Sequence, residues 1–455
     1  MATRVNIRMR VRMSSEAQSS ELTRRSKAVT NKAQRDLSVR STTLERSVGA
    51  PRKVLQKSLK LSDPVPEAGV QRAVEIMRNG GMFRFDNPEG VEDEVSKAEV
   101  DIAKYMDFRY AVGMNSCGSC IFLALKAIGV QPGDKVLSNA FTFTAVPSAI
   151  IHAGGEPVYV DCEENYILDL HDLEAKMVFS GAKWLCVSHM RGKLSDMDAI
   201  LILCQKHNVR MIEDCAHSLG VLWNGVHSGH HGEIACISAQ SYKMLNSGEG
   251  GFAVTDDDEL AAKLIMYTGA YERLYKKHTL RPADEVFEAI KAKEIPPNYS
   301  LRMNQLCAAV IRPQILTLEK RVAIYDRRYK QVEAQLSKLE NVVVPKQLTQ
   351  VRPVCDTIQF NLVRMNASQI DEFLAEANAH GVQLSIFGAK ENARNFRNWT
   401  YAPVPEDLHK TEAIIQSAVD CRLPMQFEDE DFDVMCQVIK ESIEAVMNKS
   451  CSAVV

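Results

Sequence analysis

The chain has 455 residues, 45% of them hydrophobic and 25% charged, which is an ordinary globular composition with room for one large and one smaller domain. Its formal net charge of −3 provides no overall basic field, so we expect small-molecule ligands and no nucleic-acid partner. The 12 cysteines are scattered along the chain, which favours reduced thiols over the disulfide framework of a small secreted domain.

Residues 1–60 are rich in arginine, serine and threonine, and no acidic residue precedes Glu16. Four arginines cluster near the start: Arg4, Arg8, Arg10 and Arg12. This composition resembles an organelle transit peptide, and a disordered basic tail explains it equally well. We therefore exclude residues 1–60 from the fold.

The sequence contains no apolar run that approaches the roughly 18 residues needed to span a bilayer. The N-terminus also lacks the apolar core of a signal peptide. We expect a soluble intracellular protein with no membrane partner, located in the cytoplasm or in an organelle.

The folded part is expected to begin with two amphipathic helices, because apolar residues recur at helical spacing over residues 69–80 and 91–106. Short runs rich in β-branched residues then have the length of strands. They cover residues 135–139, 156–161, 182–190, 208–215, 233–241 and 250–256. Helical segments separate several of these runs, so we predict an α/β fold with a mostly parallel, seven-stranded type of sheet between layers of helices.

The last part of the chain is predicted to form a second, smaller domain. Residues 305–336 have the pattern of one long helix that links two domains. Strand-like segments such as 357–363 then mix with helical ones such as 429–447. We predict a large domain over residues 61–315, and a linking helix with a small α+β domain over residues 316–455.

Ligands of an open α/β sheet bind beyond the carboxyl ends of the strands, so the segments that follow the predicted strands are the candidates for a site. Residues 115–120 open an apolar helix with small residues, whose exposed N–H groups suit a phosphate. Cys117 and Cys120 also have the spacing of a redox dithiol, and a structural turn is a third alternative. The segment alone does not separate the three.

Three further residues have chemistry that would suit a planar cofactor. Asp214 ends a predicted strand, and His217 lies three residues later. The Asp214 carboxylate can pair with a protonated pyridine nitrogen. Taken by itself, however, Asp214 is better interpreted as the N-cap of a helix. Lys243 lies in a glycine-containing turn. If its positive charge were suppressed there, the amine could form a Schiff base with an aldehyde, but most lysines are solvated at the surface. Phe143 could stack on a ring or belong to the core.

Several motifs occur in the order found in one known family. They read NSCGSCIFLALKAIGVQPGDKVL, AFTFTAVPSAIIHAGGEPVYVD, HMRGKLSDMDAI, VRMIEDCAHSLG, SAQSYKMLNSGEGGFAVTDDDELA and NYSLRMNQLCAA. Across residues 61–446 the chain resembles the DegT/DnrJ/StrS family of sugar aminotransferases, which are fold-type-I enzymes that use pyridoxal 5′-phosphate. The resemblance implies a transaminase of sugar or polysaccharide biosynthesis.

The resemblance implies the catalytic residues as well. Lys243 would form the Schiff base with the cofactor and, once released, would shuttle a proton during transfer. Asp214 would pair with the pyridine nitrogen, and His217 would lie near the cofactor hydroxyl. An amino acid would donate its amino group, and a keto-sugar, keto-cyclitol or related carbonyl compound would accept it in a ping-pong cycle.

The cofactor-binding residues follow from the same resemblance. Phe143 and Ala216 would cover opposite faces of the ring. The phosphate would be contacted by Gly118, Ser119 and Ser238. Cys117 and Gly118 occupy the second and third places of a motif that usually reads Ser-Gly-Thr, which removes one hydroxyl contact.

Two positive charges depart from the family pattern. Arg191 and Lys193 lie where the family has His-Leu-Tyr-Gly-Gln, and the small-domain His-Tyr-Pro segment is replaced by residues 386–388. These charges would suit a carboxylate or phosphate on the acceptor. A solvated loop accounts for them about as well.

Family members are typically homodimers, and residues 298–306 resemble the segment that the neighbouring chain supplies. Ser300 and Leu301 stand where the family favours Asn and Tyr, so one contact between the subunits is in doubt. We expect a homodimer whose other partners are a small amino donor and a carbonyl acceptor.

A metal site and other functions were weighed against this assignment. The three clustered histidines lack a matching carboxylate or cysteine spacing, so we predict no metal: they are His227, His230 and His231. A lyase or dehydratase with the same cofactor is an alternative, although family dehydratases replace the lysine by histidine and Lys243 counts against that variant. A non-catalytic regulator with this fold and a thiol oxidoreductase at Cys117 and Cys120 are the alternatives from other classes.

Overall fold

The computed structural model describes residues 52–87, 91–403 and 407–452. The expected transit peptide or tail falls outside these residues up to position 51. Residues 55–60, which the sequence analysis excluded, belong to the fold, because the side chains of Leu55 and Leu59 are only 5% and 2% exposed. Both pack into the core of the C-terminal part of the chain.

A seven-stranded sheet forms the centre of the larger part, with the order β1-β9-β8-β5-β4-β2-β3. Its strands are β1 (Tyr110–Met114), β2 (Lys135–Asn139), β3 (Glu156–Val160), β4 (Trp184–Ser188), β5 (Arg210–Asp214), β8 (Ile234–Ser238) and β9 (Gly251–Thr255). Only β9 runs against its neighbours; every other adjacent pair is parallel. The predicted α/β fold with a mostly parallel sheet is confirmed.

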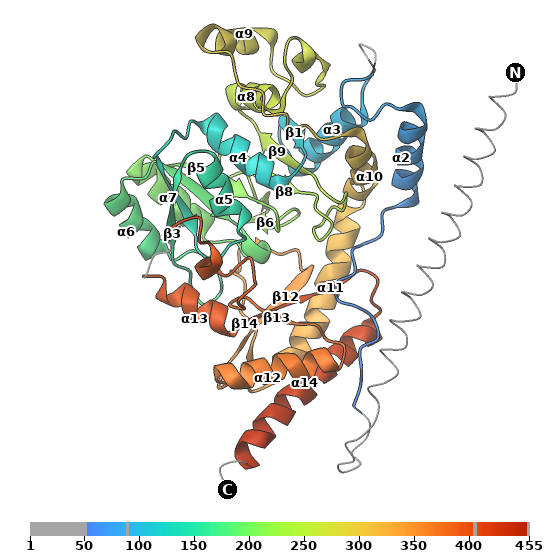
Figure 1. Cartoon of the computed structure of the whole chain (residues 1–455), viewed down its shortest axis with the longest axis vertical. Helices are drawn as coiled ribbons and strands as arrows, with labels where there is room; N and C mark the ends of the chain where they lie inside the picture. The colour runs from blue at the N-terminus through green and yellow to red at the C-terminus, as the bar shows by residue number, and fades with distance from the viewer. Residues whose placement is uncertain (1–51, 88–90, 404–406, 453–455) are drawn as a thin grey trace, which may run out of the picture. The chain divides into compact units, whose positions relative to one another are not determined.

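Helices cover both faces of this sheet (Figure 1). Successive residues of a strand point to opposite faces: in β5, Met211 belongs to the core on one face and Ile212 to the core on the other. The first core is completed by α3 (Glu94–Met106), α6 (Leu170–Ser180), α7 (Met197–His207) and α10 (Gln305–Ile315). The second is completed by α4 (Cys117–Ile128), α5 (Ala145–His152), α8 (Asp258–Thr268) and α9 (Asp284–Lys293).

Shorter elements come from both parts of the chain. The helix α2 (Glu67–Asn79) packs against α10. A small antiparallel sheet contains β11 (Val351–Arg352), β6 (Leu222–Trp223) and β7 (Val226–His227). Three single-turn 3₁₀ helices are η1 (Met190–Gly192), η2 (Leu274–Lys277) and η3 (Phe396–Asn398).

The C-terminal part is built on a four-stranded antiparallel sheet with the order β10-β12-β14-β13. Its strands are β10 (Val342–Val343), β12 (Thr357–Leu362), β13 (Ser385–Ile386) and β14 (Ala418–Arg422). The accompanying helices are α11 (Leu318–Leu336), α12 (Ala367–Ala379), α13 (His409–Ser417) and α14 (Asp429–Ser452). In Figure 1, α12 and α14 lie together beyond this sheet, at the lower end of the view.

The single long helix predicted over residues 305–336 is wrong, because the chain forms two helices there. The helix α10 ends at Ile315 and α11 begins at Leu318. Pro313 lies inside α10 and has no N–H for the helical ladder. Thr317, with φ −113° and ψ 5°, leaves the helical conformation between the two.

The described residues from 52 onward form one compact unit, so the predicted domain boundary between residues 315 and 316 stays a prediction. A separate core cluster joins the two parts, with Phe141 and Met190 from the larger part packed against Phe387 and Ile415 from the smaller. Among the described helices, none is both long and apolar enough to cross a bilayer.

Candidate functional site

A cavity of about 560 Å³ opens at the carboxyl ends of the parallel strands, where ligands of this class of sheet bind. It is lined by Ser116, Cys117, Gly118, Ile121, Phe143, Ala145, Ser188, Met190, Arg191, Asp214, Ala216, His217, Ser238, Gln240, Tyr242, Lys243, Glu249, Arg394 and Arg422. The structure thus brings together every predicted site residue except Ser119 and Lys193. Segments that are far apart in the chain build one site.

Lys243 points its amine into this cavity and is not a solvated surface lysine. Its Nζ lies 2.7 Å from His217 Nε2. Burial, together with the positive charges of Arg191 and Arg394, lowers the pKa of Lys243 to about 7. Burial and the charge of Lys243 lower the pKa of His217 well below its usual value. Both nitrogens therefore have a large neutral fraction near neutral pH, and an uncharged amine is a nucleophile.

Asp214 lies at the end of β5 and is held by hydrogen-bond donors, including the more distant Cys117 thiol at 3.9 Å, rather than serving as a helix N-cap. Its Oδ1 accepts from the Ala216 N–H at 3.0 Å, and its Oδ2 accepts from the Ser188 hydroxyl at 2.8 Å. Ser188 in turn accepts from the Thr142 hydroxyl at 2.7 Å. This buried chain fixes the carboxylate in the cavity. Ser188 and Thr142 were not identified from the sequence, because neither stands in a recognisable spacing to Asp214.

The start of α4 forms another wall of the cavity. Ser116 is its N-cap, and its Oγ accepts from the Ser119 N–H at 3.1 Å. The first N–H groups of a helix have no partner within the helix, so this end attracts anions. Gly251 allows the close approach of β9, since a Cβ there would lie 2.7 Å from the Cys117 nitrogen.

Ser119 does not line the cavity. Its hydroxyl donates to Asn115 Oδ1 at 2.7 Å and lies 2.9 Å from Ser116 Oγ. The predicted contact between the Ser119 hydroxyl and a phosphate would therefore require these bonds to change. Gly118, by contrast, lines the cavity directly.

The two cysteines at this helix start are free and buried. Burial raises the pKa of Cys117 well above its usual value, and Asp214 adds to this effect. Burial also raises the pKa of Cys120. Because thiol–disulfide exchange needs a thiolate, these values count against the redox alternative.

Arginine side chains give the cavity a positive character that the sequence analysis found only in part. Arg191 lines it as predicted, whereas Lys193 does not. The Lys193 side chain is 3% exposed, its Nζ lies 3.5 Å from the Pro345 oxygen, and burial lowers its pKa to about 8. Arg394 and Arg422 were missed, because they lie far along the chain, in the C-terminal part. No local motif marks them.

The three clustered histidines of the sequence, predicted to bind no metal, have other partners. The His230 ring stacks on Phe108 with centroids 3.8 Å apart, and its Nε2 lies 2.6 Å from the Met106 oxygen. The His227 ring lies 5.1 Å from that of Tyr105. The absence of a metal remains a prediction.

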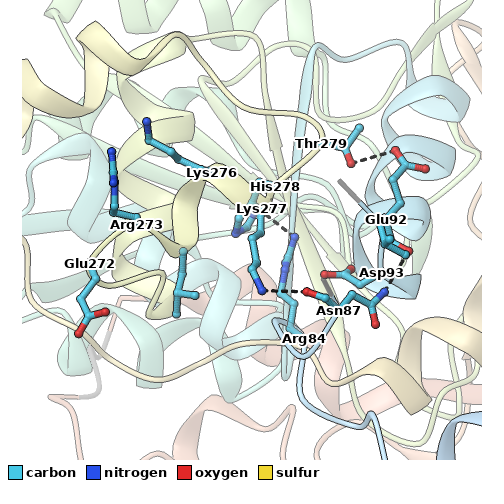
Figure 2. A pocket seen from close by; sticks show the side chains of 12 residues that line it. Arg84, Asn87, Glu92, Asp93, Glu272, Arg273, Lys276, Lys277, His278 and Thr279 are labelled. Atoms are coloured by element: carbon cyan, nitrogen blue, oxygen red, sulfur yellow. Dashed lines mark hydrogen bonds between the residues drawn. The ribbon is translucent and has the colours of Figure 1, made fainter. Parts of the chain in front are cut away.

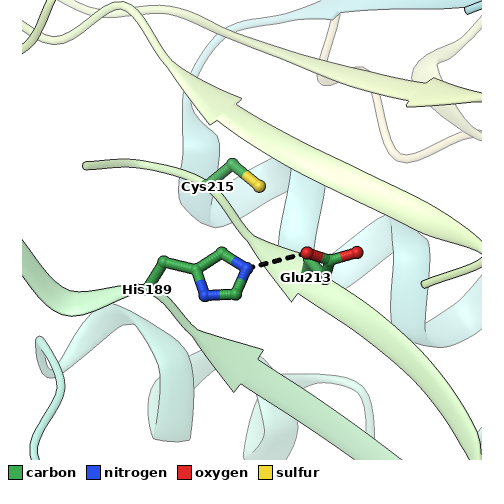
Figure 3. Close-up of side chains that lie close together, drawn as sticks. All are labelled: His189, Glu213 and Cys215. Atoms are coloured by element: carbon green, nitrogen blue, oxygen red, sulfur yellow. Dashed lines mark hydrogen bonds and ion pairs between the residues drawn. The ribbon is translucent and has the colours of Figure 1, made fainter. Parts of the chain in front are cut away.

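A different group, His189, Glu213 and Cys215, places its ligand atoms within 4.8 Å of one another (Figure 3). His189 Nε2 lies 2.7 Å from Glu213 Oε2, the contact drawn in the figure. Backbone N–H groups of Gly229, His231 and Gly232 also donate to the Glu213 carboxylate. The carboxylate is therefore saturated by donors, which indicates a structural role.

A second cavity of about 480 Å³ is lined by none of the predicted site residues, and Figure 2 shows the side chains that line it. Buried Arg84 lies beneath it, with its guanidinium paired to Glu99 and 2.9 Å from His278 Nδ1. Lys277 Nζ donates to the backbone oxygens of Phe85 and Asn87 at 2.6 and 2.9 Å. These cations are engaged in holding the surrounding loops together.

The family follows from comparison with known sequences. Residues 81–440 match the profile of the DegT/DnrJ/EryC1/StrS aminotransferase family. The chain belongs to this family. The resemblance found in the sequence is confirmed, and family membership bears out the predicted aminotransferase class and its pyridoxal phosphate cofactor.

Several curated proteins are similar to part of this chain. Spore coat polysaccharide biosynthesis protein SpsC of Bacillus subtilis (strain 168) is 38% identical over 43% of this chain and 48% of its own. GDP-perosamine synthase of Caulobacter vibrioides is 30% identical over 54% and 62%. The 3-amino-5-hydroxybenzoate synthase of Amycolatopsis mediterranei is 31% identical over 62% and 68%. The chain thus spans about half to two thirds of the length of these relatives.

Solved members of this class of fold match over most of the chain. The crystal structure of 3-amino-5-hydroxybenzoic acid synthase has a TM-score of 0.72 at 22% identity, covering 85% of this chain and 98% of that one. At this level of identity the comparison shows the fold. It agrees with the sheet order and helix layers described above.

The residues present fit pyridoxal phosphate. The cavity combines a lysine amine of lowered pKa, a carboxylate fixed by two donors and the positive end of a helix. Buried nitrogens also remain without a partner in the described part of the chain, among them Arg191 Nε and Arg394 Nε. A cationic cavity with unsatisfied donors suits a phosphorylated cofactor and an anionic substrate.

Proposed function

We propose that this chain transfers an amino group from an amino acid donor to a keto-sugar, keto-cyclitol or related carbonyl acceptor, in a ping-pong cycle with pyridoxal phosphate bound at Lys243. The observation that carries the proposal is the meeting of Lys243 and Asp214 in one cavity at the start of α4. Pyridoxal phosphate, when bound, supplies an aldehyde carbon for Schiff-base exchange and a ring that takes up an electron pair.

Lys243 is proposed to hold the cofactor and to carry the proton that moves during transfer. Its pKa of about 7 suits both tasks, because a general acid–base group works best when its pKa is near the working pH. His217 Nε2 lies within hydrogen-bonding distance of Lys243 Nζ. His217 is therefore proposed to orient the amine and to lie near a hydroxyl of the ring when the cofactor is bound.

Asp214 is proposed to pair with the pyridine nitrogen. Its carboxylate has fixed partners in Ser188 and the Ala216 N–H, so it faces the cavity without the cost of reorganisation when the ring binds. Phe143 is 37% exposed at the cavity wall and, with Ala216, is proposed to cover the ring.

The phosphate is proposed to bind at the start of α4. Gly118 contributes a first-turn N–H, and Ser238 at the end of β8 lines the same cavity. Ser119 is also proposed to contact the phosphate, because it lies in the first turn of α4. Its N–H and hydroxyl are bonded to Ser116 and Asn115.

The substrate class is proposed from the relatives. One is named for spore coat polysaccharide biosynthesis, one for a GDP-linked amino sugar and one for an aminohydroxybenzoate. Two of these names describe an amino group on a sugar or on a six-membered ring, and the third names polysaccharide biosynthesis. A cyclic carbonyl acceptor in sugar or polysaccharide biosynthesis is therefore the proposal for this chain.

A homodimer is proposed as well. Large apolar side chains are exposed along α2 and the loop after it, including Met77 at 52%, Met82 at 47% and Phe83 at 39%. Exposed apolar groups of this size favour a protein partner. Residues 298–306, the segment that resembles the one shared between subunits, lie next to this chain's own site, where Asn115 N–H donates to the Leu301 oxygen at 2.9 Å.

The test of the proposed function is cofactor uptake. Titration of the purified protein with pyridoxal phosphate should produce a visible absorption band in the wild type and in Lys135→Ala, whose lysine is exposed, but not in Lys243→Ala. Glutamate, glutamine and alanine are then screened for bleaching of the band. A wild-type protein that gains no absorbance at saturating pyridoxal phosphate contradicts the proposal.

A further inference from the structure

The cavity contains more cationic than acidic side chains. Its cations are Arg191, Lys243, Arg394 and Arg422. Its acids are Asp214 and Glu249. Desolvated like charges raise the free energy of a cavity unless an anion enters it.

Arg394 is the least satisfied of these cations. It lies between β13 and η3, and its guanidinium carbon is 5.2 Å from the centroid of the Phe143 ring. Within the described ranges, its guanidinium has no ion pair or hydrogen bond, and its Nε is buried without a partner. Burial and the charge of Arg191 lower the pKa of Arg394 to about 10.

Arg191 is held in a strained position beside it. The residue has φ 55° and ψ 29°, which lies in the left-handed region that is unfavourable for a non-glycine residue. Its guanidinium pairs with Asp420 and lies 3.4 Å from His217 Nδ1. Its Nε is buried with no partner among the residues described. Strain of this kind persists where surrounding structure fixes a functional group.

The available carboxylates do not neutralise both guanidinium groups. Asp420 accepts from Arg191 and also from Gln359 at 3.0 Å. Burial raises the pKa of nearby Asp356, which favours its neutral form and weakens it as a counter-charge. Arg394 therefore has the aromatic face of Phe143 as its contact, and Asp420, which pairs with Arg191, acts on it only through its charge.

Arg422 is engaged by other groups. Its Nη1 donates to the Leu61 oxygen at 2.9 Å, and its guanidinium lies 4.6 Å from the Tyr242 ring centroid. These contacts join β14 to the chain before α2 and to the loop that carries Lys243. We therefore assign Arg422 no part in the anion site.

We propose that Arg394 and Arg191 bind a carboxylate or phosphate group carried by the carbonyl acceptor. This inference rests on the proposed function and deepens it, since it makes the acceptor an anionic compound. Guanidinium forks bind carboxylate and phosphate groups through paired hydrogen bonds. The start of α4 is available for the phosphate of the cofactor, so a substrate is the source of the anion, and the acceptor is the substrate proposed.

The test measures anion binding to the cofactor-loaded protein by calorimetry, with succinate and inorganic phosphate as probes. Wild-type protein should bind both probes saturably. Arg394→Gln should weaken binding at least about tenfold, because it removes one charge-assisted pair of hydrogen bonds. Arg394→Lys keeps the charge but not the forked guanidinium, so its affinity for the probes should lie between those of wild type and Arg394→Gln. The matched control is Arg397→Gln, three residues along, whose side chain is 47% exposed and paired with Glu412; it should change binding less than twofold.

Two further measurements identify the source of the anion. Both are made at a pH above the pKa of Lys243 in the two proteins, so that its amine is neutral in each. Cofactor affinity, followed by the visible band, should then be the same in Arg394→Gln and wild type; a tenfold loss would assign Arg394 to the cofactor phosphate and overturn the proposal. The concentration of L-glutamate or L-alanine that half-bleaches the band should also be unchanged; a tenfold rise would assign Arg394 to the donor and equally overturn it. Wild-type protein that binds neither probe contradicts the proposal as well.

These outcomes are separable from failure of the proposed function. A protein that takes up no pyridoxal phosphate refutes the aminotransferase assignment. In that case the probes are titrated into the cofactor-free protein, and equal binding by wild type and Arg394→Gln refutes the anion site independently.

Discussion

At the scale of single residues, the amine of Lys243 is the group whose chemistry the surroundings change most. Burial, Arg191 and Arg394 lower its pKa to about 7. Only the neutral amine attacks an aldehyde. The rate of pyridoxal phosphate uptake by cofactor-free protein should therefore rise with pH up to about 7 and level off above it.

This pH dependence is measured from the growth of the visible band in stopped-flow mixing. In Arg394→Gln the removal of one positive charge should raise the pKa of Lys243 and shift the midpoint to higher pH. A rate that still rises tenfold per pH unit beyond pH 9, as expected for a solvated lysine of pKa about 10.4, would contradict the account of this cavity.

Asp214 should be needed for chemistry more than for cofactor attachment. Asp214→Asn removes the charge that is proposed to pair with the ring nitrogen, so the rate of bleaching by an amino acid should fall by roughly 10²-fold or more. Ser188→Ala leaves the carboxylate but removes one of its hydrogen-bond donors, and should lower the bleaching rate about three- to tenfold. Single-turnover absorbance measures both; equal rates in Asp214→Asn and wild type would show that Asp214 has no such role.

At the scale of elements, Glu213 ties the loop between β7 and β8 to the end of β5. Four donors reach its carboxylate, from the N–H groups of Gly229, His231 and Gly232 and from the ring of His189. Burial alone would raise the pKa of Glu213, but interactions with His189 and His231 hold this pKa below its usual range.

Glu213→Gln should lower the free energy of unfolding by about 3–5 kcal/mol, because an amide cannot accept from all of these buried donors. Glu233→Gln is the control: its carboxylate is 34% exposed and pairs with Arg210, so it should cost at most about 1 kcal/mol. A carboxylate with a depressed folded pKa stabilises above its unfolded pKa of about 4.3 and loses this contribution as pH falls. Urea titrations at pH 7 and pH 4 should show a smaller difference between Glu213→Gln and wild type at pH 4.

Six of the seven strands of the large sheet were predicted from the sequence because each is a short buried run, whereas β1 (Tyr110–Met114) was missed. The run over residues 208–215 became β5 and that over 250–256 became β9. Their order in the sheet was not predictable from these runs, since it depends on contacts between distant segments. The break between α10 and α11 was missed although Pro313 marked it, because apolar periodicity continues on both sides.

The candidate site shows the same limit. Lys243, Asp214 and Phe143 follow predicted strands and were found from local sequence and the family resemblance. Arg394 lies in an irregular loop of the C-terminal part, where neither spacing nor periodicity identifies a side chain that reaches the cavity. Lys193 was chosen because it stands in the segment where the family has His-Leu-Tyr-Gly-Gln, but after the turn at η1 its amine lies 3.5 Å from the Pro345 oxygen.

At the scale of the whole molecule, the folded unit begins earlier than the sequence indicated. Leu55 and Leu59 fill the core of the C-terminal part, and the Leu55 N–H donates to the His380 oxygen at 2.9 Å. Leu55→Ala and Leu59→Ala should each lower stability by about 2–5 kcal/mol through cavity formation. Val54→Ala, with a side chain 45% exposed, is the control and should be nearly neutral; three equal melting temperatures would mean that this segment is not part of the core.

The proposed homodimer is a property of the complete molecule as well. Light scattering after gel filtration should give twice the mass of one chain. Met77→Glu combined with Phe83→Glu introduces charge on the exposed apolar surface around α2 and should shift the mass towards that of a single chain. A wild-type mass equal to one chain would refute the dimer.

The most direct test of the central claim is borohydride reduction of the protein loaded with pyridoxal phosphate, followed by digestion and mass spectrometry. Reduction fixes a Schiff base to the lysine that forms it, and the account predicts the modified peptide that contains Lys243. Lysines elsewhere, including buried Lys193, should remain unmodified at stoichiometric cofactor. Fixation at another lysine, with Lys243 recovered unmodified, would contradict the assignment on which the proposed function rests.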